Sequence, residues 1–186
     1  MPTQPDFLKQ MQIVGAQFFK PIHYLLKLYF MATDEKLTET LNDLIKINND
    51  RIVGYEKASK QIHESDADLE IMFDKLANES RTYKHELEQK VAEAGGEIST
   101  STTVSGKIYR AWMDIKDTFS GNDRKTILAS CEYGEDAAQD AYETALDTDA
   151  DLDVETRQLI LKQKQSLKSS HDLIKRYRDV QRRASS

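Results

Sequence analysis

Residues 66–96 read DADLEIMFDKLANESRTYKHELEQKVAEAGG, and this stretch decides the fold class. Its apolar residues recur every three or four positions, so they share one face of a helix. These residues are Leu69, Met72, Phe73, Leu76, Tyr83, Leu87 and Val91. Gly95 and Gly96 follow directly, as expected for residues that end a helix. The stretch therefore predicts one long amphipathic helix over about residues 66–94.

Three further long segments show the same helical spacing, over about residues 34–62, 123–146 and 153–182. No proline occurs after Pro21, so nothing in their composition interrupts these helices. Asp153 is the expected N-cap of the last helix. No segment alternates apolar and polar residues with the period of two that is typical of a half-buried strand. The chain is therefore predicted to be all-α.

The links between these helices predict their topology. Short turns join the first two helices and the last two, whereas residues 95–122 connect the pairs. This long connection contains a shorter amphipathic stretch with Ile108, Trp112, Ile115 and Phe119 in register. Two hairpins joined by one long crossover are the topology of ferritin-like bundles. We therefore predict a ferritin-like antiparallel four-helix bundle whose long crossover carries a short extra helix.

The overall charge and the single cysteine exclude several functions. The chain has a formal net charge of −6 at pH 7, and no basic stripe with interleaved aromatic residues interrupts its acidic body. An acidic surface repels phosphates, so we expect no binding to nucleic acid. Cys131 has no second cysteine to pair with, which excludes an intramolecular disulfide and favours a cytoplasmic location.

Four runs of sequence resemble a known family. They are LNDLIKINNDRIVGYEKA (41–58), KIYRAWMDIKDTF (107–119), ASCEYGEDAAQDAYETAL (129–146) and SSHDLIKRYRD (169–179). Over about residues 34–180 the chain is similar to an uncharacterised family of bacterial ferritin-like four-helix-bundle proteins, known only as a domain of unknown function. This resemblance implies the bundle fold and assigns no activity.

A dinuclear metal site in this fold takes one Glu from each of two helices and a Glu-x-x-His from each of the other two. Neither Glu-x-x-His is complete here. Lys168 stands where the Glu should be, three residues before His171, and Thr82 stands where the His should be, three residues after Glu79. The residues that remain as candidate ligands for iron or another divalent metal are Glu56, Glu79, Glu132, Glu135 and His171. The alternative is that these side chains form ion pairs between helices.

Four polar residues fall on inward-facing positions near the middle of the predicted helices. They are Asn48, Ser80, Glu135 and Gln163. Buried polar groups are tolerated when they are hydrogen-bonded, and such a layer fixes which helices pair and in what register. We therefore expect a buried polar layer at mid-bundle and favour this structural interpretation over metal binding.

Residues 1–32 form an N-terminal extension ahead of the predicted bundle of residues 33–186. Its apolar part is interrupted by Lys20, Pro21, His23 and Lys27, so it does not suit a membrane span. Two interpretations stay open. Either residues 7–30 are an interfacial arm that contacts a membrane surface or a partner, or translation begins at Met31.

The sequence thus favours a non-catalytic binding or structural protein, with a stress-related role suggested only by analogy with the fold. The alternative is a metal-binding or iron-handling protein that uses the partial carboxylate and histidine set. Self-association into a homo-oligomer is compatible with both.

Overall fold

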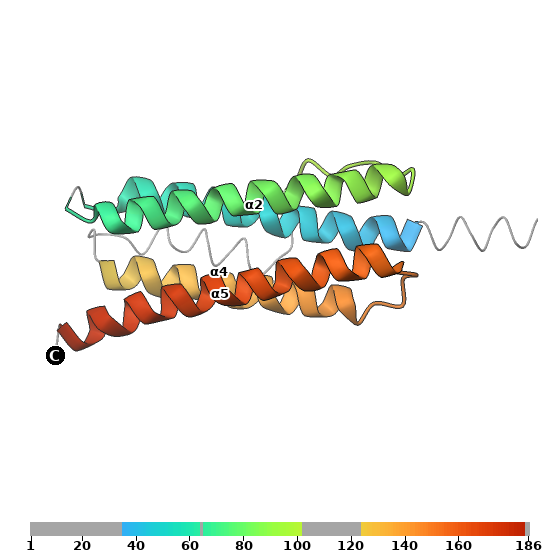
Figure 1. Ribbon diagram of the computed structural model, residues 1–186. Coiled ribbons are helices and arrows are strands. Elements are labelled where there is room, and N and C mark those ends of the chain that lie inside the picture. Colours follow the sequence, from blue (N-terminus) through green and yellow to red (C-terminus); the bar gives the residue numbers. More distant parts are fainter. Residues whose placement is uncertain (1–34, 64, 102–123, 185–186) are drawn as a thin grey trace, which may run out of the picture.

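The computed structural model describes residues 35–63, 65–101 and 124–184, and these residues form four helices and no strand. The N-terminal helix covers residues 35–61. It is followed by α2 (Ala67–Glu93), α4 (Arg124–Leu146) and α5 (Val154–Ala184). The helices lie side by side along one axis, with the N-terminal helix and α2 above α4 and α5 in Figure 1. The protein is thus all-α, as predicted.

Some predictions fall on segments that the structure does not describe. The predicted crossover helix with Trp112 falls within residues 102–123, and the predicted extension of residues 1–32, with its arm of residues 7–30, precedes the first described residue. These two features stay predictions. Among the described helices, none is long and apolar enough to cross a membrane.

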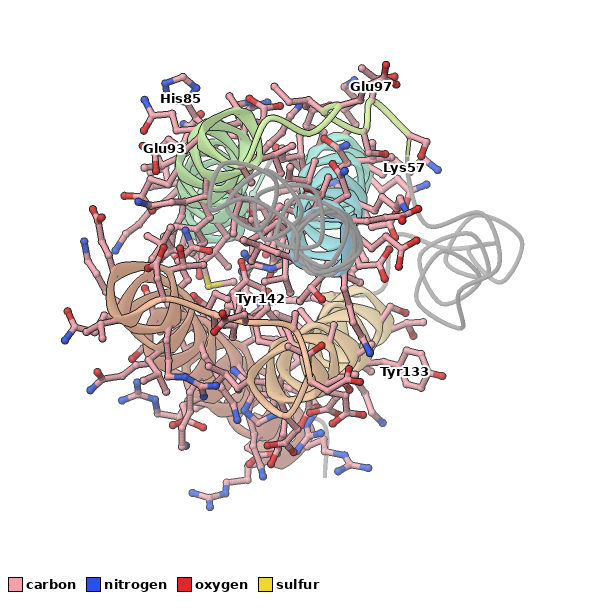
Figure 2. The ribbon with its side chains drawn as sticks, turned by 90° about the vertical axis from the view of Figure 1, so that its right-hand side faces the viewer. Lys57, His85, Glu93, Glu97, Tyr133 and Tyr142 are labelled. Atoms are coloured by element: carbon pink, nitrogen blue, oxygen red, sulfur yellow. The ribbon has the colours of Figure 1, made fainter. Side chains whose placement is uncertain are left out.

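Apolar side chains pack into two clusters along the bundle axis. One surrounds Tyr55 and Phe73, whose rings stack with centroids 5.9 Å apart. The other surrounds Leu41, Leu87 and Ile160. Burial of such side chains is the main driving force of folding. Figure 2 shows the bundle end-on, with Tyr142 pointing between the helices and His85 pointing outward.

The chain leaves α2 in a fixed direction. Gly95 adopts a positive φ of 72°, and Gly96 N–H donates to Val91 O at 3.0 Å, which ends the helix. A Cβ at Gly96 would lie 2.5 Å from Thr38 Oγ1, so only glycine fits this approach to the N-terminal helix. Asn42 then donates to Glu97 O and accepts from Ser99 N–H, at 2.8 and 2.7 Å. These hydrogen bonds hold residues 97–99 against the N-terminal helix.

Polar contacts at both ends join the two hairpins. At one end Arg124, the first residue of α4, forms ion pairs with Asp66 and Asp68 beside the start of α2, both at 2.6 Å. At the other end Lys90 of α2 pairs with Glu155 of α5 at 3.0 Å. Asp153 Oδ1 accepts a hydrogen bond of 2.7 Å from the backbone N–H of Thr156, which confirms the predicted N-cap of α5.

Candidate functional site: a buried polar centre

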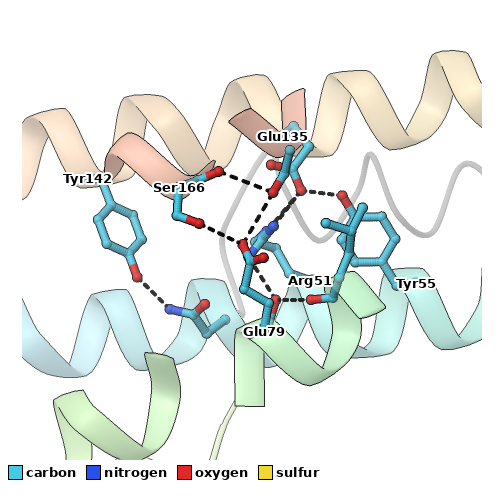
Figure 3. Close-up of polar contacts among 10 residues, drawn as sticks. Arg51, Tyr55, Glu79, Glu135, Tyr142 and Ser166 are labelled. Atoms are coloured by element: carbon cyan, nitrogen blue, oxygen red, sulfur yellow. Dashed lines mark hydrogen bonds and ion pairs between the residues drawn. The ribbon is translucent and has the colours of Figure 1, made fainter. Parts of the chain in front are cut away.

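A fully buried ion pair lies near the middle of the bundle and connects its two hairpins. Arg51 and Tyr55 come from the N-terminal helix, Ser80 comes from α2 and Glu135 comes from α4. All four residues have a relative solvent exposure of 0%. Figure 3 shows the polar atoms of Arg51, Tyr55 and Glu135 turned toward one another between the helices. We call these four residues the polar centre.

The guanidinium group of Arg51 reaches two helices at once. Its Nε and Nη2 atoms both donate to Glu135 Oε1, at 3.0 and 2.7 Å. Its Nη1 atom donates to Ser80 Oγ at 2.7 Å, and Ser80 Oγ in turn donates to Leu76 O at 2.9 Å. The hydroxyl of Tyr55 donates to the same carboxylate oxygen of Glu135. One oxygen therefore accepts three hydrogen bonds, two of them from a charged donor.

The second carboxylate oxygen, Glu135 Oε2, is buried and has no hydrogen-bond partner among the described residues. A carboxylate can accept about four hydrogen bonds. The negative charge of Glu135 is therefore compensated from one side only, by the guanidinium of Arg51. This makes Arg51 the group on which the burial of Glu135 depends.

Burial and charge keep the groups of the polar centre in fixed protonation states. Burial is the largest single effect on the pKa of Arg51 and lowers it. The charge of Glu135, its hydrogen bonds with Arg51 and the neighbouring tyrosines Tyr55 and Tyr142 together outweigh burial, so the pKa is raised. Burial raises the pKa of Tyr55 well above its ordinary value, and the charge of Glu135 adds to the rise. Near neutral pH, Arg51 is therefore positively charged and Tyr55 is a neutral hydrogen-bond donor.

A second polar layer neighbours the centre and involves all four helices. Asn48 Nδ2 donates to the hydroxyl of Tyr142 at 2.8 Å, and this hydroxyl donates to Gln163 Oε1 at 2.8 Å. Gln163 Nε2 donates to Glu86 Oε2 at 2.8 Å, which carries the chain of hydrogen bonds to α2. Burial raises the pKa of Tyr142, so its hydroxyl stays protonated.

The structure thus distributes the four expected residues of the polar layer over two layers. Asn48, Ser80, Glu135 and Gln163 are all buried. Ser80 and Glu135 meet at Arg51, whereas Asn48 and Gln163 meet at Tyr142. The two connecting residues, Arg51 and Tyr142, were missed as polar partners from the sequence. Heptad spacing indicates that both face inward, because residues seven positions apart share one face of a helix. Arg51 lies seven residues after Leu44, and Tyr142 lies seven residues after Glu135.

The five candidate metal ligands occupy separate places in the bundle. Two of them pair with arginines, since Glu56 contacts Arg81 at an exposed position and Glu132 contacts Arg178. Glu79 accepts hydrogen bonds from the hydroxyls of two serines of α5, Ser166 at 3.3 Å and Ser170 at 3.2 Å.

His171, the remaining candidate besides Glu135, lies between two aspartates. Its Nε2 atom is 3.0 Å from Asp136 Oδ1, and its Nδ1 atom is 3.1 Å from Asp172 Oδ1. In the described part of the chain, no group of three or more His, Cys, Asp or Glu side chains is arranged to hold a metal ion. The expected candidates are therefore engaged individually rather than gathered into one site.

The arrangement of the helices defines the fold class of the protein, a ferritin-like four-helix bundle. The chain belongs to the family described as "Domain of unknown function (DUF2383)", which matches residues 36–148. No curated protein matches the sequence.

Two solved structures share the fold. One is a mutant of Dps1 from Mycobacterium smegmatis, with a TM-score of 0.65 and 14% identity over 79% of this chain and 97% of that chain. The other is described as ferritin-like, diiron-carboxylate proteins from Bacillus anthracis, with a TM-score of 0.59 and 15% identity over 80% of this chain and 97% of that chain. At this identity the likeness establishes the fold alone.

A diiron centre does not fit the residues of the polar centre. Such a centre requires several carboxylates that face the same pair of cations. The polar centre has one carboxylate, and three N–H or O–H donors already point at its Oε1 atom. The guanidinium of Arg51 adds a permanent positive charge that repels a metal ion.

Proposed function

We propose that this protein is a non-catalytic binding or structural protein built on a ferritin-like bundle, and that it works without a metal centre. The ion pair between Arg51 and Glu135 supports the proposal. Glu135 is the buried carboxylate that a metal ion inside the bundle would need as a ligand. The guanidinium of Arg51, a permanent cation, already binds that carboxylate. The cytoplasmic location, the stress-related role and the homo-oligomer expected from the sequence belong to the same proposal.

Metal content, measured together with molecular mass in solution, tests this proposal. The full chain is incubated without oxygen with ferrous iron, and separately with zinc, and is then desalted and assayed for bound metal. We expect far less than one metal ion per chain, and no acceleration of iron oxidation over buffer when oxygen is admitted.

Two variants provide the controls for this experiment. Glu135→Ala removes the central carboxylate, whereas Glu70→Ala removes an exposed carboxylate in the first turn of α2 that is not among the candidate ligands. If the wild-type chain retains stoichiometric metal and Glu135→Ala abolishes it while Glu70→Ala does not, the protein is a metal-binding protein and the proposal is wrong.

A further inference from the structure

The polar centre surrounds one planar cation with matched hydrogen-bond acceptors. Arg51 presents three of its N–H groups to two acceptor atoms on different helices, Glu135 Oε1 and Ser80 Oγ. The Cζ atom of Arg51 also lies 5.6 Å from the centroid of the Tyr55 ring, within the range of a cation–π contact. The surroundings of Arg51 therefore recognise both the charge and the flat, forked shape of a guanidinium group.

The same surroundings suit neither an ammonium ion nor a divalent metal. Ser80 and Tyr55 contribute neutral hydroxyls, and both hydroxyl hydrogens are already donated, to Leu76 O and to Glu135 respectively. A single carboxylate charge balances one positive charge, not two. The guanidinium is wide enough to donate to both Glu135 Oε1 and Ser80 Oγ. A compact cation at Glu135 would not reach Ser80, whose hydroxyl would lose the donor that Arg51 provides.

We infer that the middle of this bundle is a guanidinium-binding site and that the protein fills it with its own Arg51. The inference rests on the proposed function, because both take the pair of Arg51 and Glu135 as the occupant of the interior. It extends that proposal by naming the ligand chemistry of the site. Since the ligand is covalently attached, the site is occupied in every folded molecule, without any dependence on the supply of a metal or a cofactor.

Chemical rescue tests this inference on the full chain. Arg51→Ala removes the guanidinium and the chain segment that carries it, and leaves Glu135 and Ser80 in place. N-ethylguanidinium chloride at millimolar concentration, far below denaturing levels, supplies the missing group in solution. A ligand that binds only the folded state shifts unfolding by mass action. We expect the ratio of folded to unfolded variant to rise about tenfold when the ligand is about ten times its dissociation constant.

Three comparisons give the experiment its specificity. Ethylammonium chloride at the same concentration carries the charge without the fork, and should produce no comparable stabilisation. Arg81→Ala removes an exposed arginine that pairs with Glu56, and its stability should not respond to N-ethylguanidinium. The double variant with Arg51→Ala and Glu135→Leu lacks the carboxylate, and it should lose the response as well.

Each outcome has a defined meaning. If Arg51→Ala is unfolded, rescue is read as the return of helical circular dichroism on addition of N-ethylguanidinium, and no return overturns the inference. Equal rescue by ethylammonium, or stronger rescue by zinc or ferrous iron, also overturns it. So does an Arg51→Lys variant as stable as the wild type, because lysine keeps the charge but lacks the fork. The metal content of the wild-type chain tests the proposed function separately, since the rescue is measured only in the variants.

Discussion

The interaction between Arg51 and Glu135 can be measured with a double-mutant cycle. Arg51→Met and Glu135→Leu each keep a side chain of similar volume while removing one charge. Either single substitution leaves the other charge buried without a counterion, because both partners have side-chain exposures of 0%. Breaking a buried ion pair in this way costs about 3–5 kcal/mol.

The geometry of the polar centre indicates which single variant is worse. Glu135→Leu strands a guanidinium that cannot lose its proton, and it also deprives Tyr55 of its acceptor. Arg51→Met strands a carboxylate, which can take up a proton and so escape part of the penalty. We therefore expect Glu135→Leu near the upper end of that range and Arg51→Met near the lower end.

The double variant separates pairing from simple burial. With both charges removed, no uncompensated charge remains, and such replacements of buried pairs by apolar residues are often neutral or stabilising. We expect the double variant to lie within about 2 kcal/mol of the wild type, since Ser80 and Tyr55 each lose one partner. Urea unfolding followed by circular dichroism gives all four free energies. Additive losses in the double variant would refute the reasoning, as would single losses below about 1 kcal/mol.

Three other properties follow from the structure. Burial raises the pKa of Tyr83 to about 12 and raises that of Tyr142 further. As pH rises above about 10, the unfolded chain therefore loses these protons before the folded chain does, and the free energy of unfolding falls. Urea titrations at pH 9–11 should show this fall, and Tyr83→Phe should make it shallower. Burial raises the pKa of the Cys131 thiol, so a thiol reagent should modify the native protein far more slowly than the urea-unfolded chain, and equal rates would contradict the burial. Gly96→Ala should destabilise the protein by about 1–3 kcal/mol, because the added methyl group clashes with Thr38. In the double variant, Thr38→Ala should recover part of that loss. Strictly additive effects of the two substitutions would contradict the contact.

The sequence was sufficient for the fold because the apolar period and the two glycines after α2 are local signals. It was not sufficient for the polar centre. Counting apolar residues along the N-terminal helix places Ile52 inward, whereas the structure buries Arg51 completely and leaves Ile52 half-buried. A charged residue is assigned to the surface by default because its burial is costly without a partner. The partner that makes the burial of Arg51 acceptable is Glu135, 84 residues further on.

The candidate metal ligands also show that the sequence indicates burial without indicating the partner. Helical periodicity correctly indicated that Glu135 is buried, but it gave no information about which side chain opposes it. For Glu56 and Glu132, the opposing groups are arginines on α2 and α5, far away in the sequence. A carboxylate near a bundle interior can meet a metal, a cationic side chain or, as at Glu79, neutral hydroxyls, and only the spatial arrangement distinguishes these cases.

The ion pair between Arg51 and Glu135 also constrains how the chain folds as it is synthesised. Arg51 and Ser80 belong to the first hairpin, which leaves the ribosome before Glu135 does. Until then, closing that hairpin into a compact core would bury an uncompensated positive charge, so we expect the middle of the half-made bundle to stay open and hydrated. Because the second hairpin brings the counterion, we expect the two halves to close as a single cooperative unit. The burial of Arg51 would thus be unfavourable in the unfinished chain and becomes acceptable only once the bundle is complete.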